Sequence, residues 1–178
     1  MARIASRLRI PIGIPNFAPV RQPRFVLRAK SSMTRPKFSA GSDEEALEEA
    51  LSGMLSNSGA NSGGRWAMTS TGEGLERTFK FKTFARTWDF MTAVALQCKL
   101  KNHHPEWSNV FNTTFIRWTT HHPNGLSAKD IDMAALCDSL AKDFGEVEET
   151  PVNSPGGEMQ TLANKAVSSS GDCCKPKA

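Results

Sequence analysis

The stretch HHPEWSNVFNTTFIRWTTHHPNGLSAKD, residues 103–130, predicts a β-hairpin that leads into a helix. Apolar and polar residues alternate over about 106–112 and 115–121, as they do in strands with one buried face. The residues expected on the face that covers the core are Trp107, Phe111, Ile116 and Trp118. A tight loop near 112–114 connects the two strands. Ser127 begins the helix, and Asp130 three residues later gives this start the form of a capping box. The spacing therefore indicates two antiparallel strands followed directly by a capped helix.

All four histidines of the chain lie in this stretch, in two His-His-Pro sequences that begin at residues 103 and 121. Because the second strand returns alongside the first, the hairpin brings His121 back to the corner where the first strand starts. If Thr113 and Thr114 form the loop, His121 lies opposite Glu106. A register shift of two residues places it opposite His104 instead. In both registers we expect three imidazoles and Asp130 to line one pocket.

Such a pocket suits acid/base chemistry, because imidazole titrates near pH ~6.5 and can either donate or accept a proton at neutral pH. In an elimination, one imidazole protonates a leaving hydroxyl and another takes a proton from a neighbouring nitrogen. Three alternatives stay open. The histidines could simply satisfy backbone carbonyls, they could bind zinc, although neighbouring side chains on an extended chain point apart, and Asp130 could serve only as a helix cap.

The rest of the body, residues 42–147, completes an α-β-β-α-β-β-α order. Ser42 and Glu45 predict a capped first helix, and two strands are expected over about 66–70 and 75–83. A long helix covers about 84–101. Its apolar stripe is predicted to face the core and consists of Phe84, Trp88, Met91, Ala95 and Cys98. The fold class is α+β, with a four-stranded antiparallel sheet and helices packed on one face.

The two ends differ from this body in composition. Residues 1–41 contain none of the 18 acidic residues of the chain and nine of its 22 basic ones, which is typical of a disordered mitochondrial or plastid transit segment. A basic tail without targeting function is the alternative. Residues 148–178 are rich in Pro, Gly and Ser and predict a flexible tail, which holds Cys173 and Cys174. Four cysteines without framework spacing predict no disulfide scaffold.

Charge and hydropathy exclude two classes of partner. Without the basic end, the rest of the chain carries a net charge of −5, which argues against direct binding of nucleic acid. No run of apolar residues approaches the ~20 that a membrane span needs, so no membrane partner is expected.

The histidine stretch resembles the pterin-4a-carbinolamine dehydratase family. The family signature combines a charged residue, His-His-Pro, an aromatic residue, a histidine and an aspartate at fixed spacing, and it is met here by Lys99, His103, His104, Pro105, Phe111, His121 and Asp130. The flanking sequences Phe79–Phe84, Phe90–Leu96 and Gly125–Ser127 agree with the family as well. The resemblance covers about 42–146 and implies the same order of helices and strands.

The resemblance implies dehydration of 4a-hydroxytetrahydrobiopterin to quinonoid dihydrobiopterin, with no metal and no cofactor. It implies that His103, His104 and His121 are the catalytic histidines, with His103 and His121 as acid/base candidates and His104 against the pterin. The implied substrate-binding residues are Pro105, Glu106, Trp107, Asp130 and Lys99. Lys99 stands where the family often has an acidic residue. A homo-oligomer, dimeric or tetrameric, is implied too.

Two other functions remain open at this point. The domain could be a non-catalytic module that binds a pterin or a protein partner, or it could act on another pterin cofactor inside an organelle. The transit-like end favours a mitochondrial location, and the alternative is a cytoplasmic or nuclear one.

Overall fold

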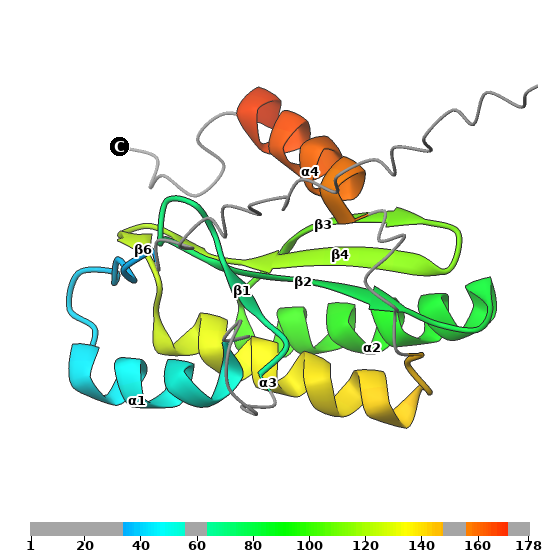
Figure 1. Ribbon diagram of the computed structural model, residues 1–178, viewed down its shortest axis with the longest axis horizontal. Helices are drawn as coiled ribbons and strands as arrows, with labels where there is room; N and C mark the ends of the chain where they lie inside the picture. The colour runs from blue at the N-terminus through cyan, green and yellow to red at the C-terminus, as the bar shows by residue number, and fades with distance from the viewer. Residues whose placement is uncertain (1–33, 56–63, 148–155, 171–178) are drawn as a thin grey trace, which may run out of the picture. The chain divides into compact units, whose positions relative to one another are not determined.

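The computed structural model of the chain describes residues 34–55, 64–147 and 156–170. A four-stranded antiparallel sheet forms the centre, with α1, α2 and α3 on one face and α4 on the other (Figure 1). The elements, in chain order, are α1 (Glu44–Met54), β1 (Ala67–Met68), β2 (Leu75–Lys80), α2 (Phe84–Lys101), β3 (Glu106–Val110), β4 (Thr113–Trp118), β5 (Thr120–His121), β6 (Asn124–Gly125), α3 (Ala128–Asp143) and α4 (Gly156–Ser170). The α+β class and the four-stranded sheet are confirmed.

The sheet has the order β1-β2-β4-β3, and its β3–β4 hairpin differs in register from the prediction. Val110 pairs with Thr113, so the loop consists of Phe111 and Asn112 rather than Thr113 and Thr114. Asn112 explains the position of the loop, because its side-chain amide donates to the carbonyl of Phe81 over 2.7 Å and its own carbonyl accepts from the Phe81 N–H. The end of β2 therefore holds the turn in place.

The shift in register leaves the two faces of the hairpin unchanged, because it moves the pairing by an even number of residues. Trp107 pairs with Ile116, and Ile116 and Trp118 are fully buried against the helices, as predicted. Phe111 was expected on this core face, but its side chain is 66% exposed at the turn. The prediction for Phe111 is wrong because the residue lies in the loop, with φ at 52°.

The face of α2 that packs against the core lies next to the face that was predicted to do so. The bounds 84–101 are confirmed, but the fully buried side chains on this helix include Phe90 and Val94, while Phe84 and Trp88 are about half exposed. The two exposed rings stack on each other with centroids 5.6 Å apart. The helix is apolar on two adjacent sides, and its periodicity does not say which of them meets the sheet.

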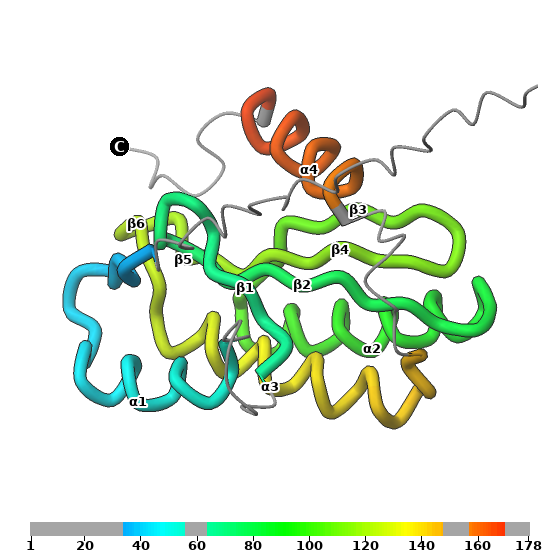
Figure 2. The backbone as a smooth tube through the Cα atoms, in the orientation of Figure 1, coloured from blue at the N-terminus to red at the C-terminus, as the bar shows by residue number. Residues whose placement is uncertain are grey.

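Residues 34–41, assigned to the disordered end by the sequence, belong to the folded body. The N–H of Lys37 donates to the carbonyl of Gly72 over 2.8 Å, and Phe38 bridges to Leu126, directly after β6. Figure 2 shows this blue segment beside β6. Gly72 has φ at +76°, and a Cβ there would lie 2.2 Å from the carbonyl oxygen of Arg35, so the close approach requires glycine. The helix cap of α1 is Asp43, which accepts from the N–H of Ala46, rather than Ser42.

Part of the C-terminal tail, which the sequence predicted to be flexible, forms helix α4. Met159 and Ala163, four residues apart, are almost completely buried and pack with Phe115 of β4. The Ser108 hydroxyl of β3 donates to the carbonyl of Met159 over 2.9 Å. This short apolar stripe sits in a sequence otherwise rich in small and polar residues, which is why composition predicted a flexible tail.

Several sequence predictions fall outside the described residues, including those on 1–33, on 148–155 and on Cys173 and Cys174. Cys137 of α3 is buried in the core, and Cys98 of α2 is partly buried against it. Burial raises the pKa of Cys98 to about 11 and that of Cys137 to about 12. Among the described helices, none has the length and apolar character needed to cross a membrane.

Candidate active site

A cavity of about 750 Å³ lies where the histidine-bearing corners meet the segment before α1. All four histidines line it, and so do Thr120 and Lys129. Residues 39–43 and the first turns of α1 form the opposite wall. This wall was not predicted, because residues up to 41 have the composition of a disordered segment. Lys129, next to Asp130 in the first turn of α3, could have been found from its position.

His103 is fixed against the body of the domain. Its Nε2 lies 2.7 Å from Oδ1 of Asp130, and its ring stacks on Trp118 with centroids 5.5 Å apart. The chain reaches this position because α2 ends at Asn102, whose left-handed φ of 48° turns the backbone out of the helix. His103 is therefore held both by a carboxylate and by an indole ring.

The carboxylate of Asp130 is completely buried, and both of its oxygens have hydrogen-bond partners. Its Oδ2 accepts from the Thr120 hydroxyl over 2.8 Å, and from the N–H and hydroxyl of Ser127 over 2.8 and 3.1 Å. The predicted cap of α3 is confirmed. Asp130 itself does not face the cavity; it lies behind His103, so it orients a cavity residue rather than meeting a bound molecule directly.

His104 and His121 form a second, more open pair on the same cavity. Their rings stack with centroids 5.4 Å apart and planes at 22°. The predicted convergence of the two His-His-Pro corners is thus confirmed, although β4 ends at Trp118 and His121 belongs to β5. His121 is reached because the chain continues past the hairpin into the small β5–β6 ribbon.

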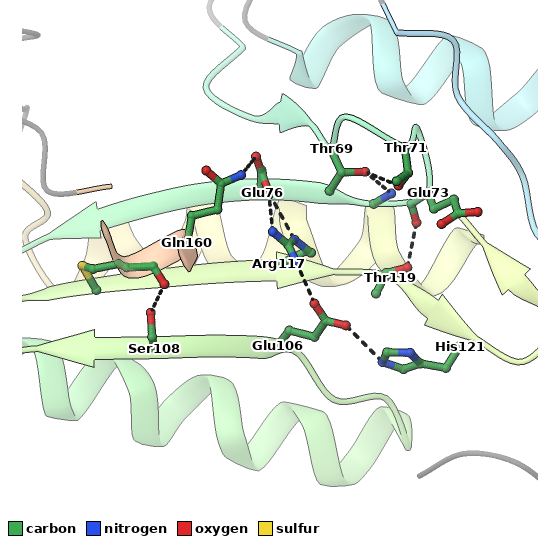
Figure 3. A network of polar contacts seen from close by, with 12 residues as sticks. Thr69, Thr71, Glu73, Glu76, Glu106, Ser108, Arg117, Thr119, His121 and Gln160 are labelled. Carbon is green, nitrogen blue, oxygen red and sulfur yellow. Dashed lines mark hydrogen bonds and ion pairs between the residues drawn. The ribbon is translucent and has the colours of Figure 1, made fainter. Parts of the chain in front are cut away.

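Like Asp130, the other four predicted substrate-binding residues lie away from this cavity. Among the described residues that line it, Lys99, Pro105, Glu106 and Trp107 do not occur. Lys99 is exposed on the last turn of α2, and Trp107 packs against the main core. Glu106 points to the other side of the sheet, under α4, where it contacts His121 and Arg117 (Figure 3).

Imidazoles in two different environments lie around one cavity, and each could transfer a proton. His103 is braced by a buried carboxylate, whereas His104 and His121 stack with each other, and part of the His121 side chain stays exposed. Within residues 34–55, 64–147 and 156–170, no group of three His, Cys, Asp or Glu side chains is placed to hold a metal ion. General acid/base catalysis needs only such groups on opposite sides of a bound substrate.

Replacing Asp130 tests how far this carboxylate holds the site together. We expect Asp130→Asn to lower the free energy of unfolding by about 1–3 kcal/mol, because an amide cannot accept from all of these donors and from His103 at once. Urea unfolding followed by tryptophan fluorescence measures this loss. Asp132→Asn, on the exposed side of the same helix, is the control and should change stability by under ~0.5 kcal/mol. Equal effects of the two substitutions would contradict the role given to Asp130.

Comparisons with known proteins agree on one family. The sequence profile described as Pterin 4 alpha carbinolamine dehydratase matches residues 42–140. A putative pterin-4-alpha-carbinolamine dehydratase of Novosphingobium aromaticivorans is 46% identical over 75 residues, which cover 42% of this chain and 78% of that protein. A protein of the same name from Rhodopseudomonas palustris is 36% identical over 99 residues, covering 56% and 98%.

A solved structure from Brucella melitensis, described as a transcriptional coactivator/pterin dehydratase, is also similar to this chain. It shares 33% sequence identity and superposes with a TM-score of 0.47, covering 55% of this chain and 95% of that one.

Proposed function

We propose, because this chain belongs to the pterin-4α-carbinolamine dehydratase family, that it removes water from 4a-hydroxytetrahydrobiopterin to give quinonoid dihydrobiopterin. This hydro-lyase reaction returns a used pterin to the pool from which the tetrahydro form is regenerated. The observation that supports the proposal most strongly is the meeting of His103, His104 and His121 on one cavity.

In this proposal the histidines supply both halves of an elimination. One imidazolium donates a proton to the leaving hydroxyl as the C–O bond breaks, while a neutral imidazole takes the proton from the adjacent ring nitrogen and a C=N bond forms. His103 and His121 are the acid/base pair, and His104 contacts the pterin. Asp130 supports His103 from behind. Lys129 and residues 39–43 face the same cavity and are further candidates for binding the pterin.

Single histidine substitutions test the catalytic proposal. We expect His103→Ala and His121→Ala each to lower kcat/KM for 4a-hydroxytetrahydrobiopterin by roughly 10²–10⁴-fold, because each removes one proton-transfer group. Stopped-flow absorbance of the 4a-hydroxy compound measures the reaction. His122→Ala lines the same cavity but removes no proposed acid or base, so it is the matched control and should lose far less. A wild-type chain no faster than buffer would end the proposal.

An exposed apolar stripe on α2 supports self-association, and it also keeps a non-catalytic interaction module as a second candidate function. Phe84, Trp88, Leu96 and Leu100 recur at multiples of four residues along the helix, and their side chains are 48–77% exposed. Neighbouring copies could bury these side chains by packing α2 against α2. We infer a homo-oligomer, a dimer or tetramer, in which α2 forms the contact.

Charge on this stripe should therefore dissociate the oligomer. Trp88→Asp places a carboxylate in the middle of the proposed contact and is expected to give a monomer, measured by light scattering after gel filtration. Arg86→Glu also changes the charge of an exposed α2 residue, but half a turn away, and should leave the mass unchanged. A monomeric wild-type chain would rule out self-association and would leave the stripe to a different protein partner.

We propose further that the basic N-terminal residues direct the chain to mitochondria, where another 4a-hydroxylated pterin is the alternative substrate. Fluorescent fusions that start at Met1 and at Met33 test this proposal. The longer fusion should co-localise with mitochondria, and the shorter one should spread through cytoplasm and nucleus. Identical diffuse distributions would contradict targeting.

A further inference from the structure

A row of three charged side chains crosses the sheet face under α4. Arg117 on β4 is paired with Glu76 on β2 and with Glu106 on β3. Its Nε and Nη2 donate to the same oxygen of Glu76 over 3.1 and 3.0 Å, and its Nη1 donates to Glu106 over 3.1 Å (Figure 3). One guanidinium thus fixes two carboxylates on opposite sides of it.

Each end of this row meets a different part of the molecule. Gln160 of α4 donates its amide to Oε1 of Glu76 over 2.6 Å. At the other end, Oε1 of Glu106 lies 3.6 Å from Nε2 of His121. The row therefore connects α4, which lies beyond the residues matched by the family profile, with a proposed catalytic imidazole.

The row is largely shielded from solvent, so its charges interact more strongly than surface charges do. The side chains of Glu76, Arg117 and Glu106 are 14%, 13% and 9% exposed. With Gln160 and His121 they line a second cavity of about 430 Å³, and His121 lines the histidine cavity as well. Water and salt screen ion pairs on a protein surface and weaken them. Partial burial keeps them away from these side chains, so the pairs hold more strongly.

We propose that Glu106 is a positioning residue that sets the tautomer of His121, and that α4 holds Glu106 in place through Gln160, Glu76 and Arg117. This inference rests on the proposed function, in which His121 transfers a proton. A carboxylate beside Nε2 draws the ring proton to that nitrogen, so the neutral ring keeps Nδ1 free to accept a proton. Glu106 acts through His121 rather than on the pterin, which replaces the substrate-binding role that the resemblance implied.

The charged and titratable groups that face His121 can be named. Glu106 of β3 contacts one ring nitrogen, and His104 stacks on the ring. Glu73, whose pKa is lowered by its hydrogen bond to Lys37, lines the same second cavity. Of these groups, Glu106 is the carboxylate in ion-pair distance of His121, so it is the one that distinguishes Nε2 from Nδ1.

The test reads the tautomer directly. The full chain, labelled with [15N]histidine, is studied by long-range 1H–15N correlation NMR at a pH above the imidazole titration range, with His121→Gln identifying the His121 signals. The wild-type ring should be mainly the Nε2–H form. Glu106→Gln keeps the shape but removes the charge, and should shift the tautomer ratio toward Nδ1–H by roughly threefold or more. An unchanged ratio overturns the proposal.

The contribution of α4 needs its own pair of variants. Gln160→Ala should move the tautomer ratio in the same direction by a smaller amount, because Glu76 and Arg117 remain. Thr161→Ala changes the next, exposed residue of α4 and should have no effect. If Gln160→Ala and Thr161→Ala behave alike, α4 has no part in positioning Glu106.

Kinetics separate this inference from the proposed function. Glu106→Gln should lower kcat by about ten- to a hundredfold with KM little changed, because substrate binding is untouched while proton transfer is misdirected. A tautomer shift in a chain without dehydratase activity would support the positioning role and refute the function. If Glu106→Gln fails to fold, Arg117→Lys serves instead, since one ammonium group cannot hold both carboxylates. An unchanged His121 tautomer in a folded Arg117→Lys chain also overturns the proposal.

Discussion

The buried carboxylate of Asp130 is the contact on which the site depends. A charge without solvent is costly unless it is matched by donors, and here hydroxyls, a backbone N–H and an imidazole surround it. These partners come from the end of α2, from β5 and from the start of α3. The same interaction therefore caps a helix, ties three segments together and fixes the ring of His103, so the stability of this corner and the geometry of the cavity are linked.

Local patterns predicted most of the framework. The alternation in the hairpin and the capping sequence at Ser127 indicated the strands, the start of α3 and the convergence of the histidines. The predicted register of the hairpin was wrong, because hydrogen bonds between Asn112 and Phe81, at the end of a distant strand, fix the position of the turn. The predicted core face of α2 was right for Met91 but wrong for Phe84 and Trp88, since two adjacent sides of the helix are apolar. Such choices depend on contacts between segments that are remote in sequence.

The sequence predicted one face of the sheet better than the other. The face under α1–α3 is covered by large apolar side chains, whose spacing is easily recognised. The face under α4 combines one small apolar contact with a charged row, and neither gives a periodic signal. Glu106 could be named as a candidate from its place after His-His-Pro, but its orientation away from the histidine cavity follows from the pleat of β3 and from Arg117 on the adjacent strand.

The close approach of residues 35–37 to Gly72 also limits how the chain can be shortened. Residues 37–39 form backbone hydrogen bonds with the β1–β2 turn and with Leu126, and residues 39–43 supply one wall of the histidine cavity. A chain shortened from its N-terminal side therefore keeps these contacts only if the cut falls before Lys37. A chain cut further in would lose one wall of the histidine cavity while keeping every histidine.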